Sequence, residues 1–482
     1  MLFNSFEFIF ALLPVSVVLY FLASRVSGWL AVSWLVLVSL FFYGWWRPEN
    51  LPLFLGSIVF NFCAAALLNS PQEKWPRRTI LMMGIAGNLG LLATFKYGQF
   101  IVANGNRLLG TSIPLPDFVL PLGISFFTFT QIAYLVDIYK SRGTRHSFSI
   151  YALFVSYYPH LLAGPILHHA EMLPQFADDQ NRKPRWDYLW QGFCLFGIGL
   201  SKKVLLADAL APYARFGFDV APKLNLLEAW LSSLAYFFQI YFDFSGYTDM
   251  AVGAALLMNI RLPFNFDSPY RACDIQAFWR KWHITLGRFF RDYFYIPLGG
   301  NRLGGKRTLI NLFGVALLSG LWHGAAWSFV AWGALHGMAM VVHALWKKWG
   351  RPLPSVVAWS LMFVFLNVSW VLFRAPDTSR MREMLRGMSG ANGVVLFSQL
   401  EPVLGFLRSA GVQFRPLAIV DMEKLLAYLV IAFVVAVLPW NSNRLAQAGA
   451  RIHPLMIAVI ALLSTISILN LNQLSEFIYF NF

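Results

Sequence analysis

The chain has 482 residues, of which 58% are hydrophobic and only 13% are charged, and its mean hydropathy is +0.57. Soluble domains carry about 25% charged residues, so this composition excludes an ordinary soluble protein and predicts a polytopic membrane protein. The net charge of +15 does not indicate nucleic-acid binding, because the basic residues lie in short loops between apolar runs, where anionic lipid headgroups attract them. We therefore expect membrane lipids, and no nucleic acid, as partners.

Long apolar runs follow one another from the first residues to the last. We predict an all-α polytopic membrane protein with about eleven or twelve transmembrane helices, because each run can span a hydrocarbon core of about 30 Å. Residues 1–482 are expected to form one membrane-embedded domain. The runs lie at 6–23, 29–46, 51–69, 79–97, 119–138, 188–207, 226–258, 308–323, 325–346, 355–373, 422–440 and 454–471.

One further apolar run, 148–167, is interrupted by Pro159, Gly164 and Pro165. Irregular backbone at membrane depth must line a cavity or be buried in protein, so this run is predicted to be re-entrant. The segment 374–421 is long and polar, and its amphipathic stretch "SRMREMLRGM" is expected to lie at a membrane surface. Three cysteines without a pairing pattern predict neither a disulfide nor a metal site.

Loop charges predict the orientation of the chain. Placing the basic loops on the cytoplasmic side leaves the N-terminus outside. These loops are 72–78, 140–146, 181–185, 261–307 and 347–351.

Polar and aromatic residues are densest between positions 236 and 302. Asp243 and Tyr247 are four residues apart in an apolar helix and therefore share a face, and Asp249 follows them. Either these side chains make polar contacts between helices, or they line a polar tunnel. The following loop combines basic and aromatic residues, which either anchor lipid headgroups or bind substrate. The candidate residues in and before this loop are Asn265, Trp279, Arg280, Trp282, His283, Arg288, Arg291 and Tyr295.

A histidine stands within the apolar stretch "SGLWHGAAWSF", residues 319–329. Ionisable residues are expensive in a membrane, so His323 is a functional candidate, and a buried neutral imidazole is a usual general base near pH 7. Gly320 and Gly324 flank it at positions where small residues permit a close backbone or substrate approach. Two tryptophans, Trp322 and Trp327, lie within the same stretch.

Two further histidines, His336 and His343, follow on one face of the next predicted helix, because they are seven residues apart. Packing between helices is the expected role for both. His336 is also a candidate for the tunnel lining.

The ordered motifs of the whole chain resemble the membrane-bound O-acyltransferase family, and within it the bacterial branch that contains the alginate O-acetylation membrane protein. The resemblance extends from residue 1 to 482. Its motifs are "LPLGISFFTFTQIAYLVDIYK" (120–140), "YYPHLLAGPI" (157–166), "YFDFSGYTDMAVG" (241–253), "FWRKWHITLGRFFRDYFYIPLGGNR" (278–302), "LWHGAAWSFVAWGALHG" (321–337) and "FIYFNF" (477–482).

This resemblance implies a central tunnel and assigns His323 to the family's essential histidine. It also places His283, 40 residues earlier, at the family's second active-site position, where lipid-modifying relatives typically have asparagine. Acetyl-CoA is then the expected acyl donor, with no bound cofactor. The implied setting is the bacterial inner membrane, with an N-terminus in the periplasm, a periplasmic acetyltransferase partner and an exported polysaccharide as acceptor.

Three alternatives stay open at this point. The same fold could transfer D-alanine to teichoic acid, or an acyl chain to lipid. A transporter or channel without a covalent step is the alternative from another class, although no internal repeat of the kind found in many transporters is evident.

Overall fold

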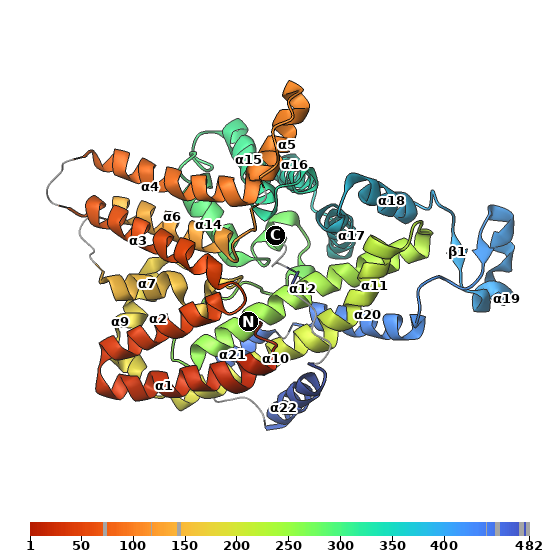
Figure 1. Ribbon diagram of the computed structural model, residues 1–482. Helices are drawn as coiled ribbons and strands as arrows, with labels where there is room; N and C mark the ends of the chain where they lie inside the picture. The colour runs from red at the N-terminus through yellow and green to blue at the C-terminus, as the bar shows by residue number, and fades with distance from the viewer. Residues whose placement is uncertain are drawn as a thin grey trace. The chain divides into compact units, whose positions relative to one another are not determined.

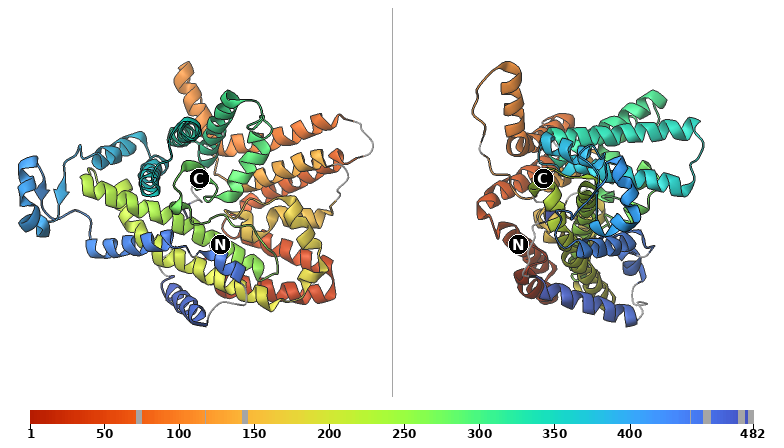
Figure 2. Two further views of the ribbon diagram at one scale, coloured as in Figure 1. Left: turned by 180° about the vertical axis from the view of Figure 1, so that it is seen from behind. Right: turned by 90° about the vertical axis from the view of Figure 1, so that its right-hand side faces the viewer.

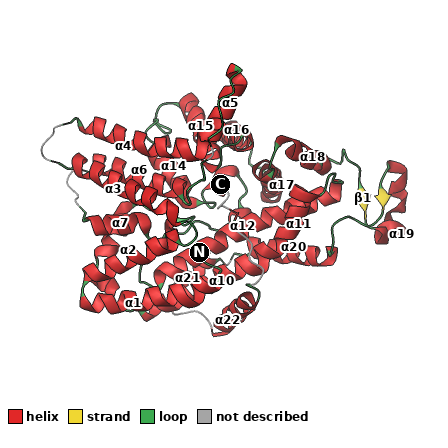
Figure 3. Cartoon of the chain, viewed as in Figure 1, coloured by secondary structure: helices red, strands yellow, loops and turns green. Residues whose placement is uncertain are grey.

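The computed structural model describes residues 1–70, 75–116, 118–141, 146–439, 441–448, 454–471 and 477–478. Helices dominate these ranges, and Figure 3 shows how little of the chain is strand. The strands β1 (Val395–Leu396) and β2 (Gln413–Phe414) pair in parallel, with Val395 opposite Gln413. The predicted all-α class is confirmed.

Two compact units make up the chain. Unit 1 contains Met1–Leu200, Gly246–Asn265 and Ser442–Phe482, and unit 2 contains Ser201–Ser245 and Phe266–Asn441. The long helix α12 (Leu226–Leu256) contributes residues to both. That residues 1–482 form a single membrane-embedded domain stays a prediction.

Unit 1 contains the N-terminal helices and the two C-terminal ones. The pair α1 and α2, red in Figures 1 and 2, packs side by side. The helices are α1 (Leu13–Val26), α2 (Gly28–Gly44), α3 (Leu51–Leu68), α4 (Arg77–Leu92), α5 (Gly98–Leu109), α6 (Ile124–Lys140), α7 (Phe148–Ser156), α8 (Tyr158–Leu161), α9 (His169–Ala177), α10 (Trp186–Ser201), α21 (Ser442–Ala448) and α22 (Pro454–Leu469).

Unit 2 contains the helices around the predicted histidine site and the polar segment 374–421. Its helices α15 and α16 pack against each other along their length. Besides the first part of α12, the helices are α11 (Asp208–Arg215), α13 (Ile275–Trp279), α14 (Ile284–Phe290), α15 (Gly305–His323), α16 (Trp327–Trp349), α17 (Ser355–Arg374), α18 (Thr378–Met388), α19 (Glu401–Leu404) and α20 (Met422–Val437).

Local sequence signals determine where several helices begin and end. The Ser27 side chain accepts a hydrogen bond from the Leu30 N–H at the start of α2, and Asp274 accepts one from Ala277 at the start of α13. Both are residue types that satisfy the otherwise unpaired N–H groups of a first helical turn. At the other end of a helix, Gly110 takes a left-handed conformation with φ of 64° after α5, which glycine adopts without steric cost.

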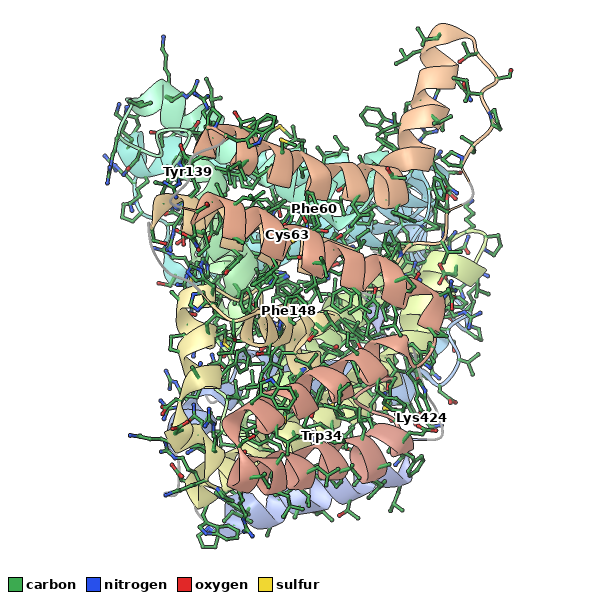
Figure 4. All side chains as sticks on the ribbon, turned by 60° about the vertical axis from the view of Figure 1, so that its left-hand side comes forward. Trp34, Phe60, Cys63, Tyr139, Phe148 and Lys424 are labelled. Atoms are coloured by element: carbon green, nitrogen blue, oxygen red, sulfur yellow. The ribbon has the colours of Figure 1, made fainter. Side chains whose placement is uncertain are left out.

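Five helical segments in the described ranges are long and apolar enough to cross a membrane, judged by length and composition. Two shorter apolar helices, Gly28–Gly44 and Pro454–Leu469, accompany them. Side chains on such helices face outward: Phe60 is 45% exposed, and Figure 4 shows it with Cys63 on the outside of α3. The larger number of about eleven or twelve spans stays a prediction from run length. The five segments are Phe8–Val26, Pro48–Leu68, Arg77–Leu109, Trp327–Trp349 and Ser355–Arg374.

The run 148–167 is broken, as its prolines and glycine predict. Helix α7 ends at Ser156, the four-residue α8 follows, and residues 162–168 are not helical. The segment is buried within unit 1, and the His160 Nε2 atom lies 2.9 Å from the Phe154 carbonyl oxygen. Irregular backbone is therefore surrounded by protein here, which is the condition that makes it tolerable in a membrane protein.

Candidate active site

His323 is the last residue of α15. The next residue, Gly324, is extended, with φ of −170°, and α16 begins three residues later at Trp327. The histidine therefore lies at the break between two packed helices. Its exposed fraction is 2%, so the break brings a polar side chain into the interior of unit 2.

The backbones of α15 and α16 approach each other closely on either side of this break. A Cβ atom on Gly320 would overlap the Phe329 carbonyl oxygen, and one on Gly333 would lie 2.8 Å from the Ala316 carbonyl oxygen. Both contacts require glycine, since any side chain would force the two backbones apart. The close approach predicted for Gly320 is thus present. Gly324 instead contacts the ring of Phe329.

Aromatic rings surround the His323 imidazole. Its centroid lies 4.9 Å from Trp322, 5.2 Å from Trp332 and 5.0 Å from Phe373, each in an edge-on arrangement. Edge-on contacts of this kind fix a ring's orientation more than simple burial does. The imidazole is therefore held in one place by rings from α15, α16 and α17.

His283 contacts Trp322 as well. Its ring centroid is 6.0 Å from Trp322, and Phe244 of α12 covers it at 4.8 Å. The residue precedes α14 with φ of 44°, a left-handed conformation that is uncommon without a nearby constraint. Burial lowers the pKa of His283 to about 3, so its imidazole is neutral near pH 7.

His283 and His323, which were predicted to act together, both contact the indole ring of Trp322. Their other aromatic neighbours differ. The sequence gives their separation along the chain but not this shared contact. Phe244, Trp332 and Phe373 complete the surroundings and were not predicted as site residues. Only their membership of apolar helices was visible in the sequence.

His336 extends the aromatic cluster along α16. Its exposed fraction is 0%, and its ring lies 4.5 Å from Trp332, 5.3 Å from Trp279 and 5.2 Å from Phe365. Neither ring nitrogen has a hydrogen-bond partner among the described residues. His336 is buried as a packing histidine would be, but the surrounding protein leaves its polar atoms unsatisfied.

The two loop tryptophans point to different partners. Trp279 lies 5.8 Å from Trp332, on the His336 side, and is partly exposed. Trp282 is 1% exposed and packs against Trp370, with the ring centroids 4.9 Å apart and the planes tilted by 46°. Trp327, by contrast, is 60% exposed at the start of α16.

The predicted arginines of the 261–307 stretch, Arg280, Arg288 and Arg291, are exposed or half-exposed residues of unit 2 and are not buried among the rings. Arg280 is exposed, whereas Arg291 donates two hydrogen bonds to Asp292, at 2.7 Å and 3.2 Å. These bonds raise the pKa of Arg291. Arg288 lies 3.8 Å from the same carboxylate, and Tyr295 is half-buried nearby. Arg280 is therefore the better placed of the predicted arginines to attract an anion.

Asp243 has a cationic partner that the sequence analysis missed. The Lys203 Nζ atom lies 2.6 Å from Asp243 and 2.8 Å from Asp208, and the side chains of Lys203 and Asp243 are 3% and 1% exposed. A buried charge of this kind requires pairing, so the contact favours the interhelical role over the tunnel wall. A lysine within the apolar run 188–207 was the available signal.

The other predicted residues of this region belong to unit 1. Tyr247 stacks between Phe3, at 4.7 Å, and Phe477, at 4.3 Å. Asp249 and Asn265 are 4% and 1% exposed within the same unit. These three residues thus belong to unit 1, whereas the aromatic cluster around His323 belongs to unit 2.

Within the described ranges, no group of three or more histidine, cysteine, aspartate or glutamate side chains is arranged to hold a metal ion. The three cysteines form no disulfide. The chemistry that these side chains can support is acid–base catalysis by imidazole in surroundings that exclude bulk water.

Fold and site together define a helical, multi-pass membrane protein with a buried histidine pair. Comparison with known families agrees: the sequence profile of the MBOAT, or membrane-bound O-acyltransferase, family matches residues 19–374. The chain belongs to this family and is an O-acyltransferase, so the alternative of a transporter without a covalent step is not retained.

Three curated relatives illustrate the range within the family. The peptidoglycan O-acetyltransferase of Helicobacter pylori is 41% identical over 100% of this chain and 98% of its own length. A probable alginate O-acetylase AlgI of Pseudomonas putida is 40% identical over 78% of each chain. The teichoic acid D-alanyltransferase of Bacillus subtilis is 26% identical over 52% of this chain and 67% of its own.

Proposed function

We propose that the protein transfers acetyl groups from a cytoplasmic acyl-CoA donor, across the bacterial inner membrane, for the O-acetylation of an exported polysaccharide. The observation that carries this proposal is the contact of His283 and His323 with one indole, Trp322. Through this indole, His323, which the family resemblance makes the essential histidine, is connected to a second buried imidazole, that of His283.

In the proposed reaction His323 is the general base. Its neutral imidazole takes the proton of the acceptor hydroxyl while the hydroxyl oxygen attacks the thioester carbonyl carbon. The carbon–sulfur bond then breaks, and the leaving thiolate takes the proton back from His323. Such a base contributes about 10²–10⁴-fold to the rate. His283, or a backbone N–H, donates a hydrogen bond to the oxyanion.

The aromatic setting supports this role in a second way. Rings of Trp322, Trp332 and Phe373 exclude water from His323, and water would otherwise hydrolyse the thioester. A histidine can also remain neutral where a lysine or carboxylate could not do so at equal cost. Neutral imidazole is the form that a general base requires.

The experiment that tests the activity is turnover of acetyl-CoA by the purified protein with a polysaccharide acceptor, read as release of the CoA thiol and as acetyl ester on the acceptor. Retained thioester in the presence of acceptor would contradict the proposal. Parallel reactions with a D-alanyl thioester and with a long-chain acyl-CoA test the two alternative acyl groups, and the D-alanyl alternative is supported by the similarity to a teichoic acid D-alanyltransferase.

A second acceptor, peptidoglycan, is favoured by one specific observation. The relative named for it matches this chain over 100% of its length, whereas the alginate relative named above matches over 78%. Mass spectrometry of exported polysaccharide and of peptidoglycan, from cells with and without the gene, separates the two acceptors. Only the true acceptor loses its acetyl ester when the gene is removed.

Orientation completes the proposal, with the N-terminus in the periplasm, a periplasmic acetyltransferase as partner and the 261–307 stretch facing the cytoplasm. Leu303 in this stretch is 64% exposed and suits labelling. In a chain lacking its native cysteines, Leu303→Cys should react with a membrane-impermeant maleimide only after the cells are opened. Labelling of intact spheroplasts from outside would overturn the orientation.

A further inference from the structure

His336 is a buried histidine of unit 2 that the proposed reaction does not use. Aromatic rings cover the whole imidazole, whose contacts come from α13, α16 and α17. Both of its nitrogens lack a hydrogen-bond partner among the described residues, and so do the indole nitrogens of Trp332 and Trp370. Trp332 lies between the other two, 4.5 Å from His336 and 5.9 Å from Trp370.

Packing alone does not explain this arrangement. A buried polar atom without a partner costs about 1–3 kcal/mol, and most such atoms in folded proteins have one. A phenylalanine at position 336 would fill a similar space among these rings without any such cost. The imidazole is therefore expected to have a partner other than the described residues of the protein.

The donor and acceptor inventory defines the chemistry of that partner. Each indole N–H can only donate, and a neutral imidazole offers one donor and one acceptor. Three donors and one acceptor thus belong to one aromatic cluster and have no hydrogen-bond partner among the described residues. They match a group rich in carbonyl oxygens. A cation would meet mostly donors, and an anion such as a phosphate would find only neutral rings in contact with His336.

We propose that His336, with the indole N–H groups of Trp332 and Trp370, binds a neutral carbonyl-bearing part of a substrate, an amide or an ester. Trp332 also contacts His323, at 5.2 Å, so the bound group lies one indole away from the proposed general base. Trp279, which contacts His336, is the partly exposed ring of the cluster, so the proposed group would enter beside it. The role of His336 is binding, and it takes no proton in the reaction.

The inference rests on the proposed acyl transfer for the source of the ligand, but its test does not need turnover. The probe is S-acetyl-N-acetylcysteamine, a small neutral thioester that also carries an amide. Binding is measured by calorimetry to protein carrying His323→Ala, which prevents consumption of the probe. In that background His336→Phe should weaken the Kd about tenfold, which corresponds to about 1.4 kcal/mol.

Two further variants make the result decisive. His336→Gln keeps a donor and an acceptor and should retain most of the affinity, while His343→Phe makes the same change two turns along α16, where the side chain is 25% exposed, and should leave the Kd unchanged. Without the probe, His336→Phe should melt at or above the temperature of its parent. An unchanged Kd in His336→Phe, or a lower melting temperature in both His336 variants, would overturn the proposal.

The source of the carbonyl group follows from kinetics with His323 intact. If the donor supplies it, His336→Phe raises the KM for acetyl-CoA. If the acceptor supplies it, the KM for the acceptor rises instead. A fall in kcat with both KM values unchanged would refute a binding role. Failure of the proposed function is distinct from all of these results, because the unaltered protein would then release no thiol from acetyl-CoA.

Discussion

Two buried histidines, His160 in unit 1 and His336 in unit 2, have the same burial but different hydrogen bonding. His160 is 3% exposed and its Nε2 atom lies 2.9 Å from the Phe154 carbonyl oxygen, so it links α8 to α7 across a helix break. His336 is 0% exposed and has no such partner among the described residues. Burial alone therefore does not distinguish the roles proposed for His160 and His336, whereas the hydrogen bonding of the two imidazoles differs.

This difference in hydrogen bonding predicts opposite changes in protein stability when each histidine is replaced. Removing a bonded imidazole leaves its former partner unsatisfied, which destabilises the fold. Removing an imidazole without a protein partner takes away a polar group that was costly to bury. Structural and ligand-binding histidines should therefore shift stability in opposite directions when each is replaced by phenylalanine.

Replacement of His323 is expected to have the largest effect on activity, because His323 is the proposed general base. His323→Ala should reduce acyl transfer at least about a hundredfold, the low end of the effect of losing a general base. The protein should remain folded and inserted, because the change removes side-chain atoms at a helix end. The measurement is acetyl content of the exported polysaccharide together with protein abundance in membranes. Normal acetylation at unchanged abundance would reduce His323 to a core residue.

Replacement of His283 should have the second-largest effect on activity, because His283 and His323 both contact Trp322. We expect His283→Ala to lower kcat by about tenfold or more, which is below the loss of about 10²–10³-fold for a sole oxyanion donor because a backbone N–H can share this role. Residues that act as a unit are not additive, so the double variant should be less impaired than the product of the single effects. Purified variants assayed for thiol release give the comparison. Fully multiplicative losses would mean that the two histidines act independently.

His160→Phe tests the structural side of the comparison. The Phe154 carbonyl oxygen would lose the partner that the structure shows, and we expect a loss of about 1–3 kcal/mol in stability. The rate per folded molecule should stay unchanged, since His160 belongs to unit 1 and not to the proposed site. Thermal unfolding in detergent and kcat of the folded fraction are measured together. Unchanged stability with a lost rate would place His160 in the reaction.

Different parts of this structure were accessible from the sequence to different degrees. Hydrophobic run length predicted the helical class, and Pro159 and Gly164 predicted the break in 148–167, because both signals are local. The ends of α15 and α16 were likewise expected beside Gly324. Residues 479–482 of the C-terminal motif "FIYFNF" lie outside the described residues.

Long-range contacts were not accessible in the same way. The face shared by Asp243 and Tyr247 was inferred from helical spacing, yet these residues belong to different compact units. Lys203 as the partner of Asp243, and Trp332 and Phe373 beside His323, depend on which helices pack together. Spacing along one chain does not contain that information. The resemblance supplied the pairing of His283 with His323, and the residues alone would not have done so.

The smallest expected effect concerns the exposed side chain of Arg280. If it attracts the phosphates of a CoA donor, Arg280→Gln should raise the apparent KM for acetyl-CoA by a few-fold, since an exposed ion pair contributes about 0.2–1 kcal/mol. The salt dependence of KM should weaken as well, because screening acts on the same attraction. Lys281→Gln is expected to behave similarly.

Arg291→Gln is the matched control for Arg280→Gln. Arg291 is also exposed, but Asp292 accepts two hydrogen bonds from it, so its charge is already compensated by a neighbour. Its removal should change the donor KM less than the removal of Arg280 does. If all of these variants leave KM unchanged and only lower the amount of protein in membranes, the basic loop anchors lipid headgroups instead. The donor would then owe its binding to neutral contacts of the kind inferred at His336, and the buried ring cluster would carry more of the recognition than the charged surface.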